Sequence, residues 1–438
     1  MKSHTESRKH DRRLFLKAGA SIAAAAAWSD RGRAQDAADP STSPHEKVVV
    51  GIMGVNGRGG ALAKSFMAAD NVEIGTICDV DSRAAERVTK TVTDAQGKAP
   101  RMVKDFRDIL DDPDIDSLVI AAPNHWHAPA AIAACNAGKH VYVEKPCCHN
   151  AQEGEWAIEA ARKQDRVVQV GTQRRSWPAL AEGVAKVHQG VIGKTLYARS
   201  WYNNRRGPIG VGQPAAVPDW LDWRLWQGPA PDRPYKDNVV HYNWHWHWHW
   251  GNGELGNNGI HGLDVARWAL DVTFPNRVSA GGGRHRYEDD QETPDTMMVT
   301  FDFPEGKTIT WEGLSWSPLG VHDSRFGVSI HGTEGSMVIR GGGYAIYDLM
   351  DNEQESQSGR AGDPDHLADF LDAIRTGRRP NADIEISHQS TALCHLGNIA
   401  YRTASTLRTD PRNGHIIDNP RAESLWGRDY APGWEPKV

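Results

Sequence analysis

The densest run of chemically active side chains is NWHWHWHWGNGELGNNGIHG, residues 243–262. Here His245, His247 and His249 alternate with tryptophans, and His261 follows near the end. An imidazole can carry a proton or bind a metal ion, and an indole face suits a sugar ring. Strict alternation predicts a strand whose histidines share one face, roughly 7 Å apart, within reach of one metal ion. Because a catalytic metal usually needs further ligands, we favour a strand that lines a sugar cleft without metal.

A second candidate for proton transfer is Lys145, in the segment HVYVEKP. The apolar run before it predicts a short buried strand, and open α/β sheets bind ligands at the carboxyl ends of such strands. A lysine acts as an acid or base near neutral pH only when burial or nearby cations lower its pKa. A structural lysine paired with a carboxylate would fit the same position.

A glycine-rich turn offers phosphate-binding chemistry. The run KVVVGIM predicts a buried parallel strand, and it leads into GVNGRGGALAKSFM, where glycines precede a helical pattern. In the fingerprint G-x-G-x-x-G the three positions are Gly54, Asn56 and Gly59, with Gly57 and Arg58 between the last two. Such a turn lets pyrophosphate approach the helix N-terminus. Asparagine tolerates left-handed backbone angles, so the turn can survive its replacement of glycine.

An acidic residue follows at the spacing expected for a dinucleotide site. The segment VEIGTICDVD predicts a second strand, and Asp79 lies 20 residues beyond Gly59 (79 − 59). A carboxylate there accepts hydrogen bonds from the adenosine ribose and repels a 2′-phosphate, which favours NAD over NADP. Arg83 nearby keeps NADP open as the alternative.

These residues need a sheet and helices to position them. Helical patterns over 82–93 and 128–137 alternate with strand patterns over 117–121 and 140–143. Regular alternation predicts a doubly wound parallel sheet. We therefore predict an NAD-binding Rossmann domain over residues 47–170, the alternative being an α/β domain that binds no nucleotide.

Composition describes a globular protein of two domains. The 438 residues can form two cores, and 39% hydrophobic with 24% charged residues excludes a disordered or membrane-embedded chain. The net charge of −6 provides no basic footprint for nucleic acid. Seventeen tryptophans against eight phenylalanines suit a carbohydrate pocket, although most tryptophans belong to protein cores. The five cysteines lack metal-type spacing, so we expect buried thiols and no obligatory disulfide.

The N-terminus predicts an export signal over 1–34, followed by a linker over 35–46. The segment SRKHDRRLFLKAGASIAAAAAW contains Arg12 and Arg13 and resembles a twin-arginine signal. Its apolar part is shorter than the roughly 20 residues that span a bilayer. A disordered basic tail is the alternative to a periplasmic or otherwise exported protein. Twin-arginine substrates are exported folded, often with a cofactor inside, so we expect tightly bound NAD.

Several motifs, in order, resemble one oxidoreductase family. The tripeptide EKP at 144–146 matches its signature, and Pro123, Asn124 and His127 match the preceding loop. Further matches are VQVGTQRR, DWRLWQGPAP, GNGELGNNGIHGLDVARW and HLADFLDAIRTGRRPNADIE. On these residues the sequence is similar to the glucose–fructose oxidoreductase / inositol dehydrogenase / MocA (Gfo/Idh/MocA) family, over essentially everything after the signal.

The resemblance implies the fold of the second half. Family members follow the Rossmann domain with a large, mostly antiparallel open sheet that commonly builds dimers or tetramers. The runs LYARSWYNN, TMMVTFDF, KTITWEGL and GVSIHG agree with this, and a helical stretch over 365–375 returns the chain. We therefore expect an α/β protein, with a Rossmann doubly wound parallel sheet and an α+β substrate-binding domain over 171–438. A homodimer or homotetramer is expected.

The resemblance also implies site residues. The EKP glutamate of the family lies beside the cofactor, which places Glu144 with the glycine turn, Pro123, Asn124 and His127. The family histidine that contacts the reacting hydroxyl corresponds to His261.

The chain departs from the family pattern four residues before His261. Many members have an aspartate there that tunes the lysine and histidine, and this chain has Asn257. An amide can hydrogen-bond a hydroxyl but cannot accept its proton, which puts a carboxylate relay at this position in doubt. We assign proton transfer to Lys145 and His261, substrate orientation to Asn257, and support of the helix to Asp264.

Further candidates for sugar contacts are Arg175, Trp126, Trp201 and Tyr202. Three functions fit these residues. The favoured one is an NAD-dependent oxidoreductase of a sugar or glycoside hydroxyl, whose NAD is recycled because free NAD is scarce outside the cytoplasm. The second is a redox-neutral glycosidase that oxidises C3 transiently, and the third is a non-catalytic sugar- or NAD-binding protein.

Overall fold

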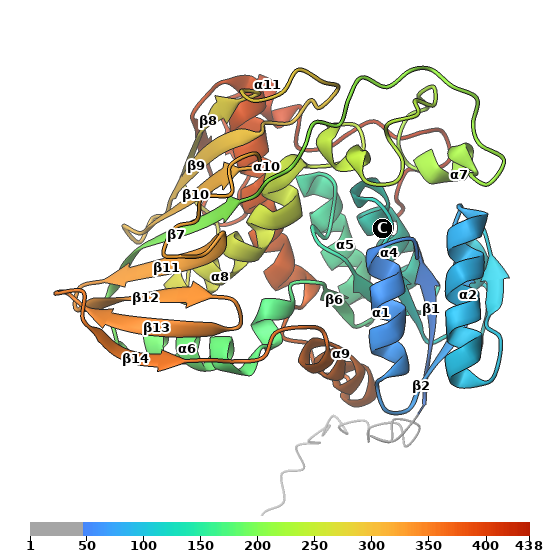
Figure 1. The fold of residues 1–438 in the computed structure, drawn as a ribbon, viewed down its shortest axis with the longest axis horizontal. Helices are drawn as coiled ribbons and strands as arrows, with labels where there is room; N and C mark the ends of the chain where they lie inside the picture. Colours follow the sequence, from blue (N-terminus) through green and yellow to red (C-terminus); the bar gives the residue numbers. More distant parts are fainter. Residues whose placement is uncertain (1–46) are drawn as a thin grey trace, which may run out of the picture. The chain divides into compact units, whose positions relative to one another are not determined.

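The computed structural model describes residues 47–438, so the predicted signal and linker lie outside the described part of the chain. The first half forms a six-stranded parallel sheet in the order β3-β2-β1-β4-β5-β6 (Figure 1). Buried β-branched side chains with few polar interruptions explain why the inner strands β1, β4 and β5 are covered on both faces of the sheet. The strands are β1 (Val48–Met53), β2 (Val72–Cys78), β3 (Arg101–Val103), β4 (Ser117–Ile120), β5 (His140–Val143) and β6 (Val168–Val170).

Helices connect these strands and cover the sheet. The predicted doubly wound Rossmann architecture is confirmed, and the predicted strand ends agree with the structure within three residues. The fourth helix begins at Asn124, four residues before the predicted start, because Pro123 caps it and Pro129 lies inside it rather than at its first turn. The helices are α1 (Arg58–Met67), α2 (Ser82–Gln96), α3 (Arg107–Leu110), α4 (Asn124–Asn136) and α5 (Ala151–Lys163).

The second half is built on a ten-stranded sheet in the order β14-β13-β12-β11-β7-β10-β9-β8-β15-β16. Its pairs are antiparallel except β7 with β10, so the predicted, mostly antiparallel sheet is confirmed. The strands are β7 (Thr195–Asn203), β8 (Arg277–Gly283), β9 (Thr296–Asp302), β10 (Thr308–Leu314), β11 (Phe326–Gly332), β12 (Gly335–Arg340), β13 (Gly343–Asp348), β14 (Glu353–Gln357), β15 (Leu407–Thr409) and β16 (Ile416–Ile417).

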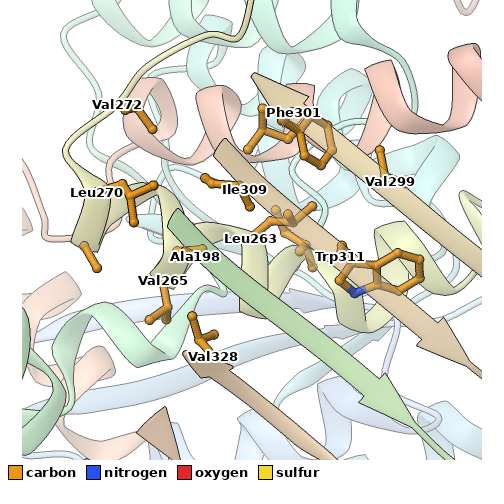
Figure 2. Close-up of a cluster of buried hydrophobic side chains, with 14 of the residues drawn as sticks. Ala198, Leu263, Val265, Leu270, Val272, Val299, Phe301, Ile309, Trp311 and Val328 are labelled. Atoms are coloured by element: carbon orange, nitrogen blue, oxygen red, sulfur yellow. The ribbon is translucent and has the colours of Figure 1, made fainter. Parts of the chain in front are cut away.

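Helix α8 (Ile260–Leu270) packs against one face of this sheet, and the core of the second half lies between them. Figure 2 shows Leu263 and Val265 of α8 among the inward side chains of the strands, including Phe301 and Trp311. The alternation of buried and half-exposed residues along β9 and β10 explains why one sheet face meets the helix. The remaining helices are the 3₁₀ helix η1 (Gln173–Ser176), α6 (Pro178–His188), α7 (Trp223–Gln227), α10 (Ile384–Thr403) and α11 (Pro420–Glu423).

Helix α9 (Pro364–Thr376) brings the chain back to the Rossmann sheet. Its Phe370 is fully buried and meets Phe66 of α1 and Tyr142 of β5 edge to face, with ring centroids 6.5 and 5.7 Å apart. The helix predicted over 365–375 is therefore present, and it packs with the first half of the chain rather than with the second sheet.

The alternating histidines and tryptophans do not form a strand. Residues Asn243–Trp246 form the 3₁₀ helix η2, and the chain then turns. The strand prediction is wrong because Trp244 and Trp250 pack into a loop cluster with Trp223 and Trp226, which outweighs the local alternation. Side chains three residues apart align in a 3₁₀ helix, so alternate residues no longer share a face.

The three histidines accordingly face different partners. His245 Nδ1 lies 2.6 Å from the Tyr242 carbonyl, and His249 Nε2 lies 2.7 Å from the Pro231 carbonyl. His247 Nδ1 lies 3.7 Å from the Glu292 carboxylate. Nowhere in residues 47–438 do three His, Cys, Asp or Glu side chains gather in an arrangement that could hold a metal ion.

Two further structural facts bear on the composition. All five cysteines are buried free thiols. Across the described chain, no helix combines the length and apolar character needed to cross a membrane.

Replacing Phe370 by alanine tests whether α9 is part of the first core. We expect the Phe370→Ala variant to lose about 3–5 kcal/mol of unfolding free energy, because a buried ring is exchanged for a cavity. Urea unfolding followed by tryptophan fluorescence measures this loss. The matched control is Met102→Ala on β3, a residue that is 49% exposed, so its truncation should matter little. Equal losses in the two variants would contradict the packing of α9.

Candidate active site

A cavity of about 500 Å³ opens at the carboxyl ends of β1, β2, β4 and β5. Residues directly after these strands line it, as expected for an open parallel sheet. Its second wall comes from α7, from residues 241–245 at η2, and from Asn257 with the first turn of α8. The lining includes most predicted site residues: Gly54, Asn56, Gly57, Arg58, Asp79, Pro123, Asn124, Trp126, His127, Glu144, Lys145, Asn257 and His261.

The glycine turn forms the floor of this cavity. Gly54 has a φ of +82°, and a Cβ there would lie 2.7 Å from the Ala122 amide nitrogen. A Cβ on Gly59 would overlap the Gly54 carbonyl oxygen. Gly57 is the N-cap of α1 and supplies no side-chain cap, so amides of the first turn remain for an anion.

The asparagine in the fingerprint needs no special backbone. Asn56 is absent from the residues with positive φ, so the turn does not require glycine at this position. Its Oδ1 instead accepts a hydrogen bond of 3.1 Å from Arg87 of α2. The turn is therefore intact because Asn56 has an ordinary backbone conformation, and the predicted left-handed angle is wrong.

Asp79 is placed to read the ribose side of a dinucleotide. It is 9% exposed, and its carboxylate accepts hydrogen bonds from the amides of Val55 (2.6 Å) and Asp81 (2.9 Å). Burial raises its pKa, while these two bonds oppose that effect. Arg83 does not line the cavity, because its guanidinium binds Asp81 and lies 3.4 Å from the centroid of the Trp220 ring.

Arg58 ties three distant segments together beside the turn. Its Nε donates to Glu144 at 2.7 Å, and its two terminal nitrogens donate to Asp363 at 2.8 and 2.7 Å. Asp363 lies 305 residues further along the chain, directly before α9. The ion pairs fix Glu144 at the end of β5, where the resemblance predicted a cofactor neighbour.

The loop before α4 supports the opposite wall. His127 has ring nitrogens 2.6 Å from the Pro146 carbonyl and 2.8 Å from the Ala122 carbonyl, so it clamps the segment after β5 to the segment after β4. Asn124 donates to Asn252 at 2.9 Å. These residues shape the site, and their side chains are already engaged with protein groups.

Lys145 reaches across from the Rossmann sheet to the second half of the chain. Its Nζ donates to the Asn257 carbonyl at 2.9 Å and lies 3.4 Å from Asn257 Oδ1. Asn257 lies in the π-helical turn η3 (Leu255–Gly259), where the α-helical bonding pattern shifts and carbonyls become available to side chains. Burial lowers the pKa of Lys145, and the nearby Glu144 carboxylate acts in the other direction. A lysine of lowered pKa is a suitable acid or base.

His261 lies on the first turn of α8 and lines the same cavity. None of the hydrogen bonds among the described residues engages its ring, which leaves both nitrogens to a bound molecule. Burial, followed by the charge of Lys145, holds its pKa well below the usual value. The ring is therefore neutral at pH 7 and can both donate and accept a hydrogen bond.

A carboxylate missed by the sequence analysis lies behind Asn257. Glu254 is 3% exposed, accepts hydrogen bonds from Asn258 (2.5 Å) and Asn257 (3.5 Å), and pairs with Arg206 at 2.6 Å. The acid that many family members carry at the position of Asn257 is thus absent, and a different acid lies one turn earlier. Glu254 is visible in the sequence GNGEL, three residues before Asn257.

Three predicted sugar contacts do not line the cavity. Arg175 is committed to a buried ion pair with Asp264, 2.8 Å away. Trp201 is fully buried in the second core and donates to the Ser324 carbonyl. Tyr202 lies against Arg206. Local pattern does not show which face of β7 Trp201 and Tyr202 occupy, nor that Arg175 of η1 pairs with Asp264.

Other aromatic and polar side chains line the wall of the cavity. Trp126 does line the cavity, with its ring nitrogen bound to the Trp226 carbonyl at 3.0 Å. Residues that the sequence analysis did not assign to this wall include Gln173, His241, Tyr242 and Trp244.

A Rossmann sheet with a glycine turn and an acid after the second strand, followed by a large, mostly antiparallel sheet, is typical of oxidoreductases with a dinucleotide-binding fold. Family models agree with this class. Residues 48–172 match the oxidoreductase family with an NAD-binding Rossmann fold, and residues 198–435 match the C-terminal alpha/beta domain of the same family. The chain belongs to the Gfo/Idh/MocA family of oxidoreductases.

Curated relatives include both dehydrogenases and glycosidases. A levoglucosan dehydrogenase of Pseudarthrobacter phenanthrenivorans is 28% identical over 54% of this chain and 58% of its own length. A scyllo-inositol 2-dehydrogenase (NAD(+)) of Bacillus subtilis is 27% identical over the same shares. A glycosyl hydrolase family 109 protein of Saccharopolyspora erythraea is 33% identical over 36% of this chain and 35% of its own length. The chain thus spans between about a third and three fifths of these relatives.

Solved structures share the fold. A levoglucosan dehydrogenase in complex with NADH and levoglucosan has a TM-score of 0.65 at 21% identity, covering 83% of this chain and 99% of its own. An aldose-aldose oxidoreductase from Caulobacter crescentus has a TM-score of 0.62 at 20% identity, covering 83% and 100%.

Replacing Gly59 by alanine tests the glycine turn. The added methyl group would displace the Gly54 carbonyl, so we expect Gly59→Ala to bind NAD at least about tenfold more weakly, by isothermal titration calorimetry. Gly207→Ala is the matched control, because its Cβ would meet nothing within 4 Å and its φ is not positive. Unchanged NAD binding by Gly59→Ala would refute the assignment of this turn.

Proposed function

We propose that this protein is an NAD-dependent oxidoreductase that converts a secondary hydroxyl of a sugar or glycoside to a ketone. The observation that carries the proposal is that Lys145, His261 and the uncapped glycine turn line one cavity. The dehydrogenase relatives support a polyhydroxylated substrate. The tryptophans and Tyr242 on the wall supply apolar faces for a sugar ring.

The residues present fit NAD. The first-turn amides of α1 and the missing Cβ of Gly57 leave room for a pyrophosphate, and Asp79 can accept from ribose hydroxyls. The engagement of Arg83 with Asp81 and Trp220 supports NAD over NADP, because that guanidinium is already paired. The chemistry that NAD supplies when bound is acceptance of the hydride from the carbinol carbon.

The protein's own residues would handle the proton. Neutral Lys145 accepts the proton of the hydroxyl, with Nζ oriented by the Asn257 carbonyl. Neutral His261 hydrogen-bonds the same oxygen or its neighbour and holds the ring in place. Asn257 contributes orientation only, since its amide cannot take a proton.

Tight retention and recycling of NAD remain part of the proposal. The twin-arginine pattern in residues 1–34 motivates export to the periplasm, where released NAD would be lost. In a recycling cycle the first sugar gives up a hydride and a proton, and a second carbonyl substrate takes up both. The structural likeness to an aldose-aldose oxidoreductase is consistent with this scheme. Mass spectrometry of protein purified from the periplasm checks it, and protein free of nicotinamide would refute it.

A redox-neutral glycosidase is the second candidate, favoured by the relatives named as family 109 glycosyl hydrolases. Oxidation at C3 would acidify the proton at C2. Loss of that proton with the leaving group, addition of water and return of the hydride would complete hydrolysis. Lys145 would again be the base closest to the reacting carbons.

The sheet of the second half motivates a proposal about assembly. Its outward face exposes Met298, and we propose a homodimer or homotetramer built on this face. Size-exclusion chromatography with light scattering tests the assembly, and a monomer at micromolar concentration would contradict it.

A screen of free sugars and aryl glycosides against nicotinamide absorbance distinguishes the functions. Reduction of NAD by a free sugar without release of an aglycone supports the oxidoreductase. Release of an aglycone without net NADH supports the glycosidase. Bound nicotinamide with neither change across the screen would favour a non-catalytic binding protein and overturn the proposal.

Replacing Lys145 by methionine tests the proton acceptor. We expect kcat to fall about 10²- to 10⁴-fold at pH 7 because the base is removed while the apolar stem is kept. The control is Lys64→Met on the exposed side of α1, which should keep full activity. Steady-state assays with the best substrate of the screen measure both. Full activity of Lys145→Met would show that another group takes the proton.

Replacing Glu254 by glutamine tests the charge behind Asn257. Burial lowers the pKa of Lys145, the Glu254 carboxylate partly offsets this, and Arg206 lowers the pKa further. Removing the carboxylate leaves Arg206 unopposed, so the pKa of Lys145 falls. Only neutral Lys145 accepts a proton, so the ascending limb of the kcat/KM profile should move to lower pH. The exposed Glu305→Gln is the control; a limb that stays or moves to higher pH would contradict the coupling.

A further inference from the structure

A second cavity, of about 530 Å³, lies on the other side of the tryptophan-rich segment. It is bounded by the start of α5, the last turns of α10, residues 248–252 and the chain after α11. None of its lining residues lines the first cavity. The wall between the two is thin, because Asn124 of the first cavity donates directly to Asn252 of the second at 2.9 Å.

The charged side chains that line this second cavity are mostly cationic. Arg233, Arg402 and Arg428 all line it, whereas the only lining carboxylate in the described chain is the exposed Asp429. Asp429 meets Arg428 through its main-chain carbonyl, 3.2 Å from Arg428 Nε. The volume lies within the range of small-molecule sites.

The charge of Arg428 is partly balanced by the buried Glu153 carboxylate, which acts from beyond ion-pair distance. Its Nη1 donates to Nδ1 of His149 at 3.1 Å, and His149 Nε2 lies 3.1 Å from the Trp248 carbonyl. Burial holds the pKa of His149 well below its usual value, so the ring is neutral and accepts through Nδ1 while it donates through Nε2. Within residues 47–438 no carboxylate approaches Arg428 to ion-pair distance.

Arg402 and Arg233 are the other two arginines that line this cavity. The guanidinium of Arg402 lies 5.0 Å from the centroid of the Trp248 ring, and it forms no ion pair with any described carboxylate. Arg233 is only loosely paired, 3.8 Å from Glu292. Arg402 and Arg233 are exposed, whereas Arg428 is only partly exposed, and a partly desolvated guanidinium without a paired carboxylate is costly. An oxyanion with two or three oxygens matches the planar donors of these arginines.

We propose that this cavity is a second ligand site, for a monosaccharide-sized molecule that carries a carboxylate, phosphate or sulfate group. Arg428 and Arg402 bind the oxyanion, and the exposed part of the Trp248 ring contacts the carbon skeleton. The site is separate from the NAD cavity, so its occupation is measurable without turnover.

The experiment is calorimetric titration of the purified protein with inorganic phosphate, sulfate, D-glucuronate and neutral D-glucose. Excess NAD is present so that the amides of the glycine turn are occupied. We expect at least one of the anions to bind and glucose to bind more weakly at this site. The anion that binds best identifies the source of the charge, a sugar carboxylate or a phosphate or sulfate ester.

Arginine variants locate the site. Arg428→Gln and Arg402→Gln should each weaken anion binding about tenfold or more, and the exposed Arg412→Gln should leave it unchanged. Arg402 is itself exposed, so its variant should fold normally, which melting temperatures check.

Two outcomes overturn the proposal. One is the absence of anion binding up to about 10 mM. The other is binding that survives in both cavity variants or that Arg412→Gln weakens equally. Loss of NAD binding or of catalysis alone would bear on the proposed function and leave this site standing.

Discussion

The contact of Lys145 Nζ with the Asn257 carbonyl is the interaction on which the site depends. It joins the end of a Rossmann strand to the π turn before α8, so Lys145 of one half and His261 of the other line one cavity. A plain α-helical turn would engage that carbonyl within the helix. The π turn, the lysine and the histidine therefore form one unit, and Glu254 and Arg206 set the charge behind it.

The strands of the site were predictable because short buried runs of β-branched residues carry a strong signal. Strand β5 was predicted with its observed ends, and the glycine turn and Asp79 follow their strands as expected. The helix α9 was also predictable as an element. Its packing partner was not, since the burial of Phe370 against Phe66 and Tyr142 depends on contacts more than 200 residues apart.

The errors of prediction have physical reasons of the same kind. Alternation of histidine and tryptophan is a period-two pattern that predicts a strand. The segment forms a 3₁₀ helix and a turn instead, because its indole rings pack against Trp223 and Trp226. Arg175 and Trp201 looked polar or aromatic enough to contact a sugar, but their partners Asp264 and Ser324 are distant in sequence. Local pattern identifies an element, whereas long-range partners decide which of its side chains face a cavity.

The tryptophan-rich segment, residues 243–250, lines both cavities. As a turn it presents His245 to the NAD cavity and Trp248 and His249 to the cationic cavity. Its indole rings fill the space between them, with Trp223, Trp226 and Trp250 in direct ring contact. The two cavities share no lining residue, yet a hydrogen bond of 2.9 Å joins Asn124 of the first wall to Asn252 of the second. An anion bound as proposed in the second cavity would therefore lie close to the wall of the first cavity, where we propose that the sugar binds.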